Sequence, residues 1–374
     1  MSIIEGKVAY IFSGELVRQC NRLPTMKNRA SIVQDLITSY KLLYNDNMAV
    51  VLSEKATEEE LKLFHSTSFV EFMKKINDLE DFEDFDEEQV EFGLGYDCPI
   101  LENMFDFARV VAGGSLTAAK LLAAKKCRTA INWFGGWHHA QRDSAEGFCY
   151  VNDIVIAIQK LSEVFDKILY VDLDVHHGNG VQNAFEMSKK ILTLSFHKLI
   201  PGFYPGTGNL DDIGSNKGKY YSINVPYLSG ISHNTYLILF DEIFAKIVKK
   251  FKPQCLVIQC GADTLRGDPI GEGNLTLKTM GECVKKIMDC KLPTLYLGGG
   301  GYNFPNTARL WAYLTSLILK CDLDDDIPDS CDYFTQFVPT YELHIDPSLQ
   351  KDENKNNYVE HVIKTVESYC EFIC

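Results

Sequence analysis

The segment ILYVDLDVHHGNG, residues 168–180, contains both a strand signal and a group of possible metal ligands. Its first four residues form an apolar run that predicts a buried strand. Asp174 and His176 follow at alternate positions, which turns both side chains to the same side of an extended chain. A carboxylate and an imidazole together favour Zn²⁺ or another first-row ion over Mg²⁺ or Ca²⁺. Taken alone, the segment could equally be a strand-end turn whose carboxylates bond loop amides.

The alternation of apolar strands with helical patterns predicts the fold class. The predicted strands are residues 8–12, 130–133, 168–171, 191–195, 256–259 and 294–297. The predicted helices are residues 31–43, 115–126, 153–165, 234–251, 276–288 and 306–319. This pattern is typical of an α/β fold with a central, mostly parallel sheet flanked by helices on both faces. Because neither repeats nor linkers divide the sequence, we expect a single domain over residues 1–374, with its core at about 8–350 and a short C-terminal helix at 354–372.

Polar or glycine-rich motifs follow five of the predicted strands. They are GGWHH, DLDVHH, SFH with the following PGFYPGTG, GAD, and GGGGY. In open parallel sheets ligands bind beyond the carboxyl ends of the strands, so we expect one site assembled from distant segments. The candidate zinc ligands are Asp174, His176 and Asp263, since a catalytic zinc keeps three protein ligands and an open position.

Two further kinds of side chain complete a hydrolytic site. His138 and His139 are candidate bases for a metal-activated water, although adjacent histidines are often structural. Tyr302 follows the glycine run and is the candidate hydrogen-bond donor to a developing oxyanion. Together with the metal, these groups predict hydrolysis of an amide or ester.

Composition limits the partners and the compartment. The 374 residues lack an uninterrupted apolar stretch of membrane-spanning length, so we expect no membrane span. The net charge of −14 argues against direct nucleic-acid binding and fits a cationic partner. Residues 78–91 hold nine acids and no Lys or Arg, which predicts a solvated loop that could help recruit a basic ligand. Twelve cysteines without CxxC pairs predict buried free thiols in the nucleus or cytosol.

In their order along the chain, GGWHHA, GFCYVND, DLDVHHGNG, PGFYPGTG, GAD and LGGGGYN resemble the motifs of zinc-dependent class I histone deacetylases. The resemblance is strongest to the type 8 branch and covers about residues 8–350. It implies the arginase–deacetylase α/β fold. It also implies removal of the acetyl group from acetyl-lysine, in histone tails or other proteins, at the end of a narrow channel.

The resemblance also implies a role for each motif residue. The zinc ligands are Asp174, His176 and Asp263, with Fe²⁺ as an alternative metal. His139 is the general base and acid, and His138 is its electrostatic partner. Asp172 supports His138, and Asn179 occupies the position that orients His139. Tyr302 polarises the acetyl carbonyl.

The implied substrate contacts run from the channel rim to its inner end. They are Asp97, Gly147, Phe148, Tyr204, Trp137, Ile270, Gly300 and Arg29. Asp97 would hold the substrate backbone amides, Phe148 and Tyr204 would sandwich the lysine methylenes, and Arg29 would lie near an acetate-exit cavity. From the residues alone, Asp97 reads as a turn residue, the two aromatic side chains as core, and Arg29 as a surface charge at a helix start.

Two structural sites for K⁺ or Na⁺ are implied as well. The first would use Asp172, Asp174, His176, Ser195 and Phe196. The second would use backbone oxygens near Phe185, Ser188, Ile191 and Tyr221.

The chain departs from the class I pattern at several positions. Asn179 stands where that pattern has aspartate, and an amide can accept the Nδ1 hydrogen of His139 but cannot stabilise an imidazolium by charge. We therefore expect a lower His139 pKa and an acidic limb of activity at lower pH, which Asn179→Asp should move upward. Tyr204 replaces a phenylalanine, Ile270 a methionine and Thr25 a lysine, which leaves fine specificity open.

Three alternatives to a protein lysine deacetylase remain open. The same chemistry could act on acylated polyamines or long-chain acyl-lysine, since the rim consists of loops. Arginase-like manganese chemistry would need a two-metal site with more carboxylates. A weakly active scaffold in a corepressor complex is opposed by the complete set of candidate ligands, base and tyrosine. We expect the protein in nucleus and cytoplasm, with corepressor partners undecided.

Overall fold

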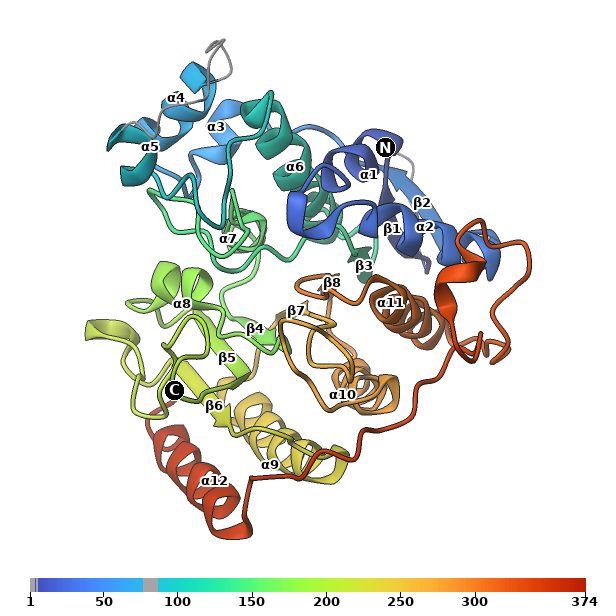
Figure 1. Cartoon of the computed structure of the whole chain (residues 1–374). Coiled ribbons are helices and arrows are strands. Elements are labelled where there is room, and N and C mark those ends of the chain that lie inside the picture. Colours follow the sequence, from blue (N-terminus) through green and yellow to red (C-terminus); the bar gives the residue numbers. More distant parts are fainter. Residues whose placement is uncertain (1–3, 5, 77–86) are drawn as a thin grey trace.

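The computed structural model describes residue 4 and residues 6–76 and 87–374. Its centre is one sheet with helices on both faces (Figure 1). The strands are β1 (Val8–Phe12), β2 (Met48–Leu52), β3 (Thr129–Asn132), β4 (Ile168–Asp172), β5 (Ile191–Lys198), β6 (Ser222–Tyr227), β7 (Cys255–Gln259) and β8 (Thr294–Leu297). Their spatial order is β2-β1-β3-β8-β7-β4-β5-β6, and every neighbouring pair is parallel.

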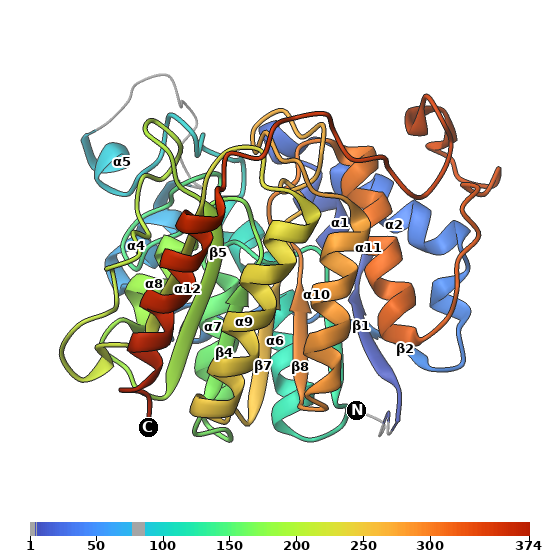
Figure 2. The same cartoon turned by 90° about the horizontal axis from the view of Figure 1, so that it is seen from below.

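The helices cover the two faces of this sheet. They are α1 (Gly14–Cys20), α2 (Arg29–Ser39), α3 (Glu58–Leu61), α4 (Thr67–Lys75), α5 (Glu87–Glu91), α6 (Met104–Ala123), α7 (Asp153–Leu161), α8 (Asn179–Phe185), α9 (His233–Phe251), α10 (Leu277–Asp289), α11 (Phe304–Leu319) and α12 (Asn356–Cys370). Helices α9 to α12 lie in front of the sheet in Figure 2, and α6, α7 and α8 lie behind it. This single α/β domain confirms the expected arginase–deacetylase fold.

The six predicted strands are confirmed, and the sheet is wholly rather than mostly parallel. The sequence reasoning missed β2 and β6, which form the two edges. β2 is the short apolar run MAVVL, in which only Met48 is buried, whereas β6 is buried along its whole length. In β6, Ser222 and Asn224 interrupt the apolar pattern, and Pro226 is tolerated because an edge strand has a free side.

Helix α6 begins at Met104, well before the predicted residue 115. The prediction missed its first half because two glycines in the middle of the helix interrupt the helical pattern. A Cβ atom on Gly113 would lie 2.0 Å from the carbonyl oxygen of Glu54. The glycine therefore permits a close approach between this helix and the segment after β2. The C-terminal helix α12 falls inside the expected range 354–372.

The strand order brings distant segments to one edge of the sheet. The chain forms β3 and then β4, but β7 and β8 later insert between them. The four central strands are therefore β3, β8, β7 and β4. The loops at their carboxyl ends carry the predicted motifs, so the order of the strands, rather than proximity in sequence, assembles the site.

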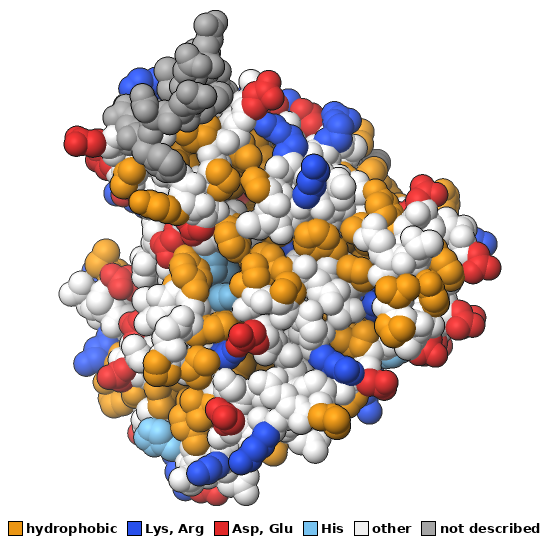
Figure 3. Space-filling model, viewed as in Figure 1, with side chains coloured by type: hydrophobic (Ala, Val, Ile, Leu, Met, Phe, Trp, Pro, Cys, Tyr) orange, Lys and Arg blue, Asp and Glu red, His pale blue; other side chains and the backbone are white. Residues whose placement is uncertain are grey.

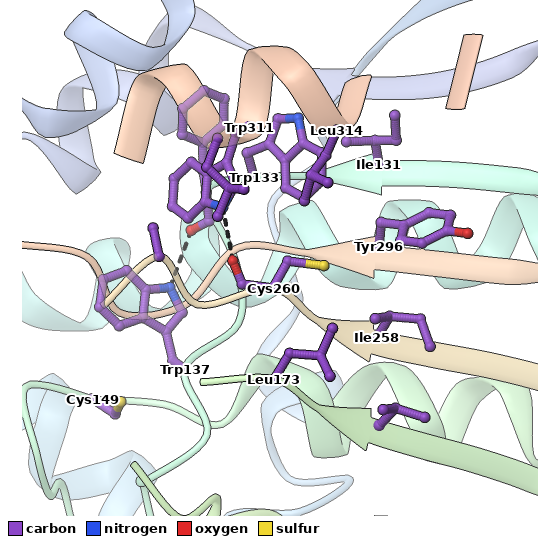
Figure 4. Close-up of a cluster of buried hydrophobic side chains, with 14 of the residues drawn as sticks. Ile131, Trp133, Trp137, Cys149, Leu173, Ile258, Cys260, Tyr296, Trp311 and Leu314 are labelled. Atoms are coloured by element: carbon purple, nitrogen blue, oxygen red, sulfur yellow. Dashed lines mark hydrogen bonds between the residues drawn. The ribbon is translucent and has the colours of Figure 1, made fainter. Parts of the chain in front are cut away.

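Two tryptophans pack directly beneath these loops (Figure 4). The rings of Trp133 and Trp311 stack with centroids 5.8 Å apart and planes inclined by 5°. Trp311 Nε1 donates to the Cys260 carbonyl at 2.8 Å, and Trp133 Nε1 donates to Thr315 Oγ1 at 2.9 Å. Helix α11 is thereby fixed to the loops after β3 and β7.

We expect Trp311→Ala to lower the free energy of unfolding by about 3–5 kcal/mol, because it leaves a large cavity and an unpaired carbonyl at Cys260. Urea denaturation of the purified protein measures this change. Trp311→Phe is the matched control, since it keeps the stacked ring and loses only the indole donor. An alanine variant as stable as the phenylalanine variant would show that the stack contributes little.

Three sequence expectations concern the remaining chain. All twelve cysteines lie in the described part, form no disulfide there and are mostly buried, which confirms the expectation of free thiols. Among the described residues, no helix is both long enough and apolar enough to cross a membrane. Most of the acidic segment 78–91, with its suggested role in recruiting a basic ligand, lies outside the described residues.

Candidate active site

The three candidate metal ligands meet at the carboxyl edge of the sheet. Asp174 and His176 follow β4, and Asp263 follows β7. His176 Nδ1 lies 3.0 Å from Asp263 Oδ2 and 3.2 Å from Asp174 Oδ1. The candidate ligand atoms all lie within 4.8 Å of one another, and the three side chains are buried. In Figure 3, histidine surface is visible at the bottom of a hollow that is bordered by hydrophobic side chains.

The electrostatics of this group favour a bound cation. Burial and the adjacent charge of Asp174 raise the pKa of Asp263 to about 7. Burial alone would lower the pKa of His176, but hydrogen bonds to Asp174 and Asp263 raise it to about 10. Two buried carboxylates are costly unless a positive charge compensates them. Two carboxylate oxygens and one imidazole nitrogen are a donor set that fits Zn²⁺.

Neighbouring groups hold the two carboxylates in place. Gln259 Nε2 and the Gly300 amide donate to Asp174 Oδ2 at 2.7 and 2.9 Å, and the Val175 amide donates to Asp263 Oδ1 at 3.0 Å. A Cβ atom on Gly300 would lie 2.0 Å from Asp263 Oδ2, so only glycine lets this backbone approach. Sequence reasoning missed Gln259, whose signal is a polar residue at the end of a buried apolar strand.

The two histidines after β3 are linked to each other and to separate partners. His138 Nδ1 donates to Asp172 Oδ2 at 2.8 Å, and the Nε2 atoms of His138 and His139 are 3.0 Å apart. His139 Nδ1 lies 2.8 Å from Asn179 Oδ1. The Tyr170 hydroxyl donates to the same Asp172 oxygen at 2.6 Å. The structure thus brings four of the five predicted catalytic positions, all but Tyr302, into one chain of contacts.

The environments of the two histidines push their pKa values apart. Burial alone would lower the pKa of His138, but the charges of Asp172 and Asp174 raise it to about 9. Burial and then the charge of His138 lower the pKa of His139 well below 6.5. At neutral pH His138 is therefore a positively charged imidazolium, whereas His139 is a neutral imidazole. Such divergence between paired titratable groups is typical of catalytic acids and bases.

A buried aspartate that sequence reasoning missed holds the loop before these histidines. Asp153 begins α7 and accepts hydrogen bonds from the Gly136 amide at 3.0 Å and the Trp137 amide at 2.8 Å. Ser115 donates to the same carboxylate. The only sequence signal was its place as the last residue of GFCYVND. Trp137 itself is buried and lines the inner cavity.

Tyr302, the fifth predicted catalytic residue, lines the same cavity as the histidine pair. It follows the run Gly298–Gly301 after β8 and lines one cavity with His138, His139 and Asp174. Asp268 Oδ2 accepts from the Tyr302 amide at 2.6 Å and thereby fixes the backbone at this point. Burial, together with the charges of Asp263 and Asp174, keeps the pKa of Tyr302 well above 10, so its hydroxyl remains protonated. Asp268 is a further support that sequence reasoning missed.

Arg29 lies inside the protein and is not a surface charge. It begins α2, and its Nη1 donates to the carbonyls of Gly299 and Gly301 at 2.9 and 3.1 Å. Its guanidinium lies over the rings of Trp311 and Trp137, with centroids at 5.2 and 6.0 Å. A buried cation thus braces the backbone of the tyrosine loop.

The remaining predicted contacts surround the mouth of the site. Asp97 Oδ2 accepts from the Gly147 amide at 2.7 Å. Phe148, at a left-handed φ of 65°, lies 5.8 Å from the Tyr302 ring, and the Tyr204 ring lies 5.0 Å from that of His139. Ile270 is 39% exposed and does not line the inner cavity, so it belongs to the outer rim.

Some residues of the two monovalent-cation sites implied by the resemblance are neighbours in the structure. Asp172 lies opposite Ser195 in the β4–β5 register, next to Phe196 and close in sequence to Asp174 and His176. At the other site, the Phe185 carbonyl accepts from the Ser188 amide at 2.8 Å and the Tyr221 carbonyl accepts from Thr193 at 3.0 Å. Ile191 begins β5 beside them. Ion binding at both places stays a prediction.

Comparison with known proteins agrees with this geometry. Residues 23–318 match the histone deacetylase domain family. The chain is 45% identical over 361 residues to "Histone deacetylase 8" of Xenopus tropicalis, covering 96% of both chains. It is 45% identical over 360 residues to the protein of that name in Danio rerio, covering 96% of this chain and 94% of the other. It is 38% identical over 358 residues to human "Histone deacetylase 1", covering 95% of this chain and 73% of that protein.

The similarity therefore spans the central strands and the loops that carry the candidate ligands, the histidine pair and the tyrosine. A match of this length and identity shows membership of the family and not only a similar fold. The chain belongs to the class I histone deacetylase family of hydrolases.

Proposed function

We propose that this enzyme is a zinc-dependent lysine deacetylase that hydrolyses the acetyl amide of N-acetyl-lysine in histones or other proteins. One observation carries the proposal: the buried Asp–His–Asp group adjoins, through Asp174, a cavity that is also lined by a charged and a neutral histidine and by a protonated tyrosine. Within the described ranges, one such group of three metal-ligating side chains is present, which does not favour a two-metal, arginase-like site.

The proposed metal ligands are Asp174, His176 and Asp263. A bound Zn²⁺ would supply Lewis-acid polarisation of the acetyl carbonyl and would acidify water. Gln259 and Gly300 orient the Asp174 carboxylate for this role through their hydrogen bonds. Removing a supporting contact of this kind typically lowers metal affinity by one or two orders of magnitude.

The proposed proton transfers use the two histidines differently. His139 is neutral, so its Nε2 can accept a proton from the attacking water and later deliver it to the leaving lysine amine. His138 stays protonated between Asp172 and His139 and stabilises negative charge that develops nearby. Tyr302 donates a hydrogen bond from its hydroxyl to the developing oxyanion. Arg29 holds the loop that presents this tyrosine.

The channel walls account for recognition of lysine in a peptide. Phe148 and Tyr204 would sandwich the lysine methylenes, and Trp137 would close the inner end. Asp97 uses one carboxylate oxygen for Gly147, which leaves the other to accept substrate backbone amides at the rim. The cavity beside the candidate ligands is narrow and is lined by Trp137, the histidine pair and Tyr302, which favours a short acyl group over a long one. We also propose K⁺ or Na⁺ at the two cation sites and residence in nucleus and cytoplasm.

The first test compares acyl-lysine peptides of increasing chain length and an acetylated polyamine with zinc-loaded enzyme. We expect kcat/KM for acetyl-lysine to exceed that for long-chain acyl-lysine by at least about tenfold, since pocket size sets acyl discrimination. Faster turnover of the long-chain peptide or of the polyamine would support the alternative substrates. No turnover of any substrate, despite one zinc per chain, would support a scaffold role.

The pH dependence gives a separate prediction. A general base must be neutral, and the pKa of His139 lies well below 6.5 because of burial and the charge of His138. Activity should therefore persist as the pH falls through 6.5 and decline only at lower pH. A profile of kcat/KM against pH, with zinc content measured at each point, checks this. A half-maximal rate at pH 6.5 or above, with zinc still bound, would contradict it.

A further inference from the structure

Asn179 poses an orientation problem that an aspartate would not. Both oxygens of a carboxylate accept hydrogen bonds, so either can face His139. An asparagine amide has one accepting oxygen and one donating nitrogen of nearly equal shape. If the amide turned over, its nitrogen would face His139 Nδ1, and the imidazole would have to carry its proton at Nε2. That tautomer has no lone pair at the atom that faces the site.

A neighbouring carboxylate resolves this ambiguity. Asn179 Nδ2 donates to Glu146 Oε1 at 2.6 Å, while Asn179 Oδ1 lies 2.8 Å from His139 Nδ1. An ionised carboxylate accepts hydrogen bonds and cannot donate them. The nitrogen of the amide must therefore face Glu146, and the oxygen must face His139. His139 then carries its proton at Nδ1 and keeps a lone pair at Nε2.

Glu146 is itself held by two further donors. Gln141 Nε2 donates to Oε2 at 2.8 Å, and the Tyr204 hydroxyl donates to Oε1 at 3.0 Å. Gln141 also accepts from Asn183 at 3.1 Å. The carboxylate thus has fixed partners on both oxygens and is half-buried between the histidine loop and the channel wall. Hydrogen bonds to an ionised acceptor are roughly twice as strong as neutral ones, which strengthens the orientation of the amide.

We propose that Glu146 is a positioning residue: by fixing the orientation of the Asn179 amide, it sets the tautomer of His139 that can act as the base. This inference rests on the proposed role of His139. It also gives a physical reason why the chain can carry asparagine at position 179. The negative charge lies one hydrogen bond farther from the imidazole, at residue 146 instead of residue 179.

The test uses Glu146→Gln, because a glutamine can present either its oxygen or its nitrogen to Asn179 and no longer dictates the orientation. In protein labelled with ¹⁵N-histidine, we expect the His139 nitrogen shifts to move from the Nδ1-protonated form toward a mixture of tautomers. With an acetyl-lysine peptide, we expect kcat to fall about tenfold, with KM changed less than about twofold and zinc content unchanged.

An exchange of the two groups provides the rescue. Asn179→Asp alone would bring two carboxylates into contact, so it should not improve the enzyme. Asn179→Asp combined with Glu146→Gln restores one carboxylate and one amide in the opposite order. We expect this double variant to recover the Nδ1-protonated tautomer and most of kcat. Asn183→Ala is the control, since it removes a neighbour of Gln141 but no contact of Glu146, and it should leave tautomer and kcat unchanged.

Two results would overturn the proposal. One is a wild-type tautomer and kcat in folded Glu146→Gln. The other is a lower kcat with an unchanged tautomer, which would mean that Glu146 acts through Tyr204 and the channel wall. Absence of turnover in the wild type would refute the proposed function, but the nitrogen shifts would still decide the role of Glu146, so the two failures are distinguishable. If Glu146→Gln alone does not fold, the double variant Asn179→Asp with Glu146→Gln decides the question. Nitrogen shifts that show His139 protonated at Nε2 in this double variant would refute the proposal.

Discussion

Asp263→Asn should abolish stoichiometric zinc binding and lower deacetylation by about a thousandfold or more. The neutral amide removes one of two anionic ligands, and it leaves His176 facing an asparagine instead of the carboxylate oxygen now 3.0 Å away. Loss of the metal removes several kcal/mol of charge stabilisation in the transition state, and each 1.4 kcal/mol corresponds to about tenfold in rate. The fold should persist, because the packing beneath the loops is unchanged.

Metal content per chain and kcat/KM measure this effect together. Asp241→Asn is the matched control, since Asp241 pairs with Lys286 on the surface of α9 and α10. That control should bind one zinc and turn over normally. One tightly bound zinc in Asp263→Asn, with normal turnover, would exclude Asp263 as a ligand.

Tyr302→Phe should lower kcat by about a hundredfold to a thousandfold while zinc content stays at one per chain. The substitution removes only the hydroxyl, whose pKa is held well above 10 by burial and by the charges of Asp263 and Asp174. Loss of one oxyanion donor costs this much in comparable hydrolases. Because the ring still packs near Phe148, we expect KM to change little.

The comparison is steady-state turnover of one acetyl-lysine peptide by both proteins. Tyr333→Phe serves as the control, because Tyr333 immediately precedes the 3₁₀ turn Phe334–Phe337 and does not line the cavity of the site. Equal kcat in Tyr302→Phe and the wild type would remove the tyrosine from the mechanism. A large increase in KM with constant kcat would assign it to substrate binding instead.

The sequence predicted the central strands because strands covered on both faces are continuously apolar. It did not predict that β7 and β8 insert between β3 and β4, since nothing in a strand's own residues specifies its neighbours. The edge strand β6 was missed because Ser222, Asn224 and Pro226 interrupt its apolar run, although the whole strand is buried. The fold class was therefore predictable, whereas the order that assembles the site was not.

The same distinction applies to the site. The candidate ligands are visible in short motifs, because metal chemistry restricts the residue types that can serve. Supporting residues such as Asp153, Gln259 and Asp268 act on backbone amides or side chains from other segments, so their partners appear only in the folded chain. Arg29 shows the reverse case: the residues alone favour a surface charge, but its guanidinium is buried against the tyrosine loop.

The late insertion of β7 and β8 has a consequence for biosynthesis. Because β4 pairs with β7 and β3 pairs with β8, a nascent chain that ends before β7 leaves the inner edges of both β3 and β4 unpaired, and β3 stays unpaired there until β8 is made. Unpaired edges of this kind are open to aggregation, and pairing across such long sequence separations is slow. The metal centre cannot form until translation has passed Asp263. Newly made chains should therefore depend on chaperones until the last central strand is in place, and they should acquire metal only afterwards.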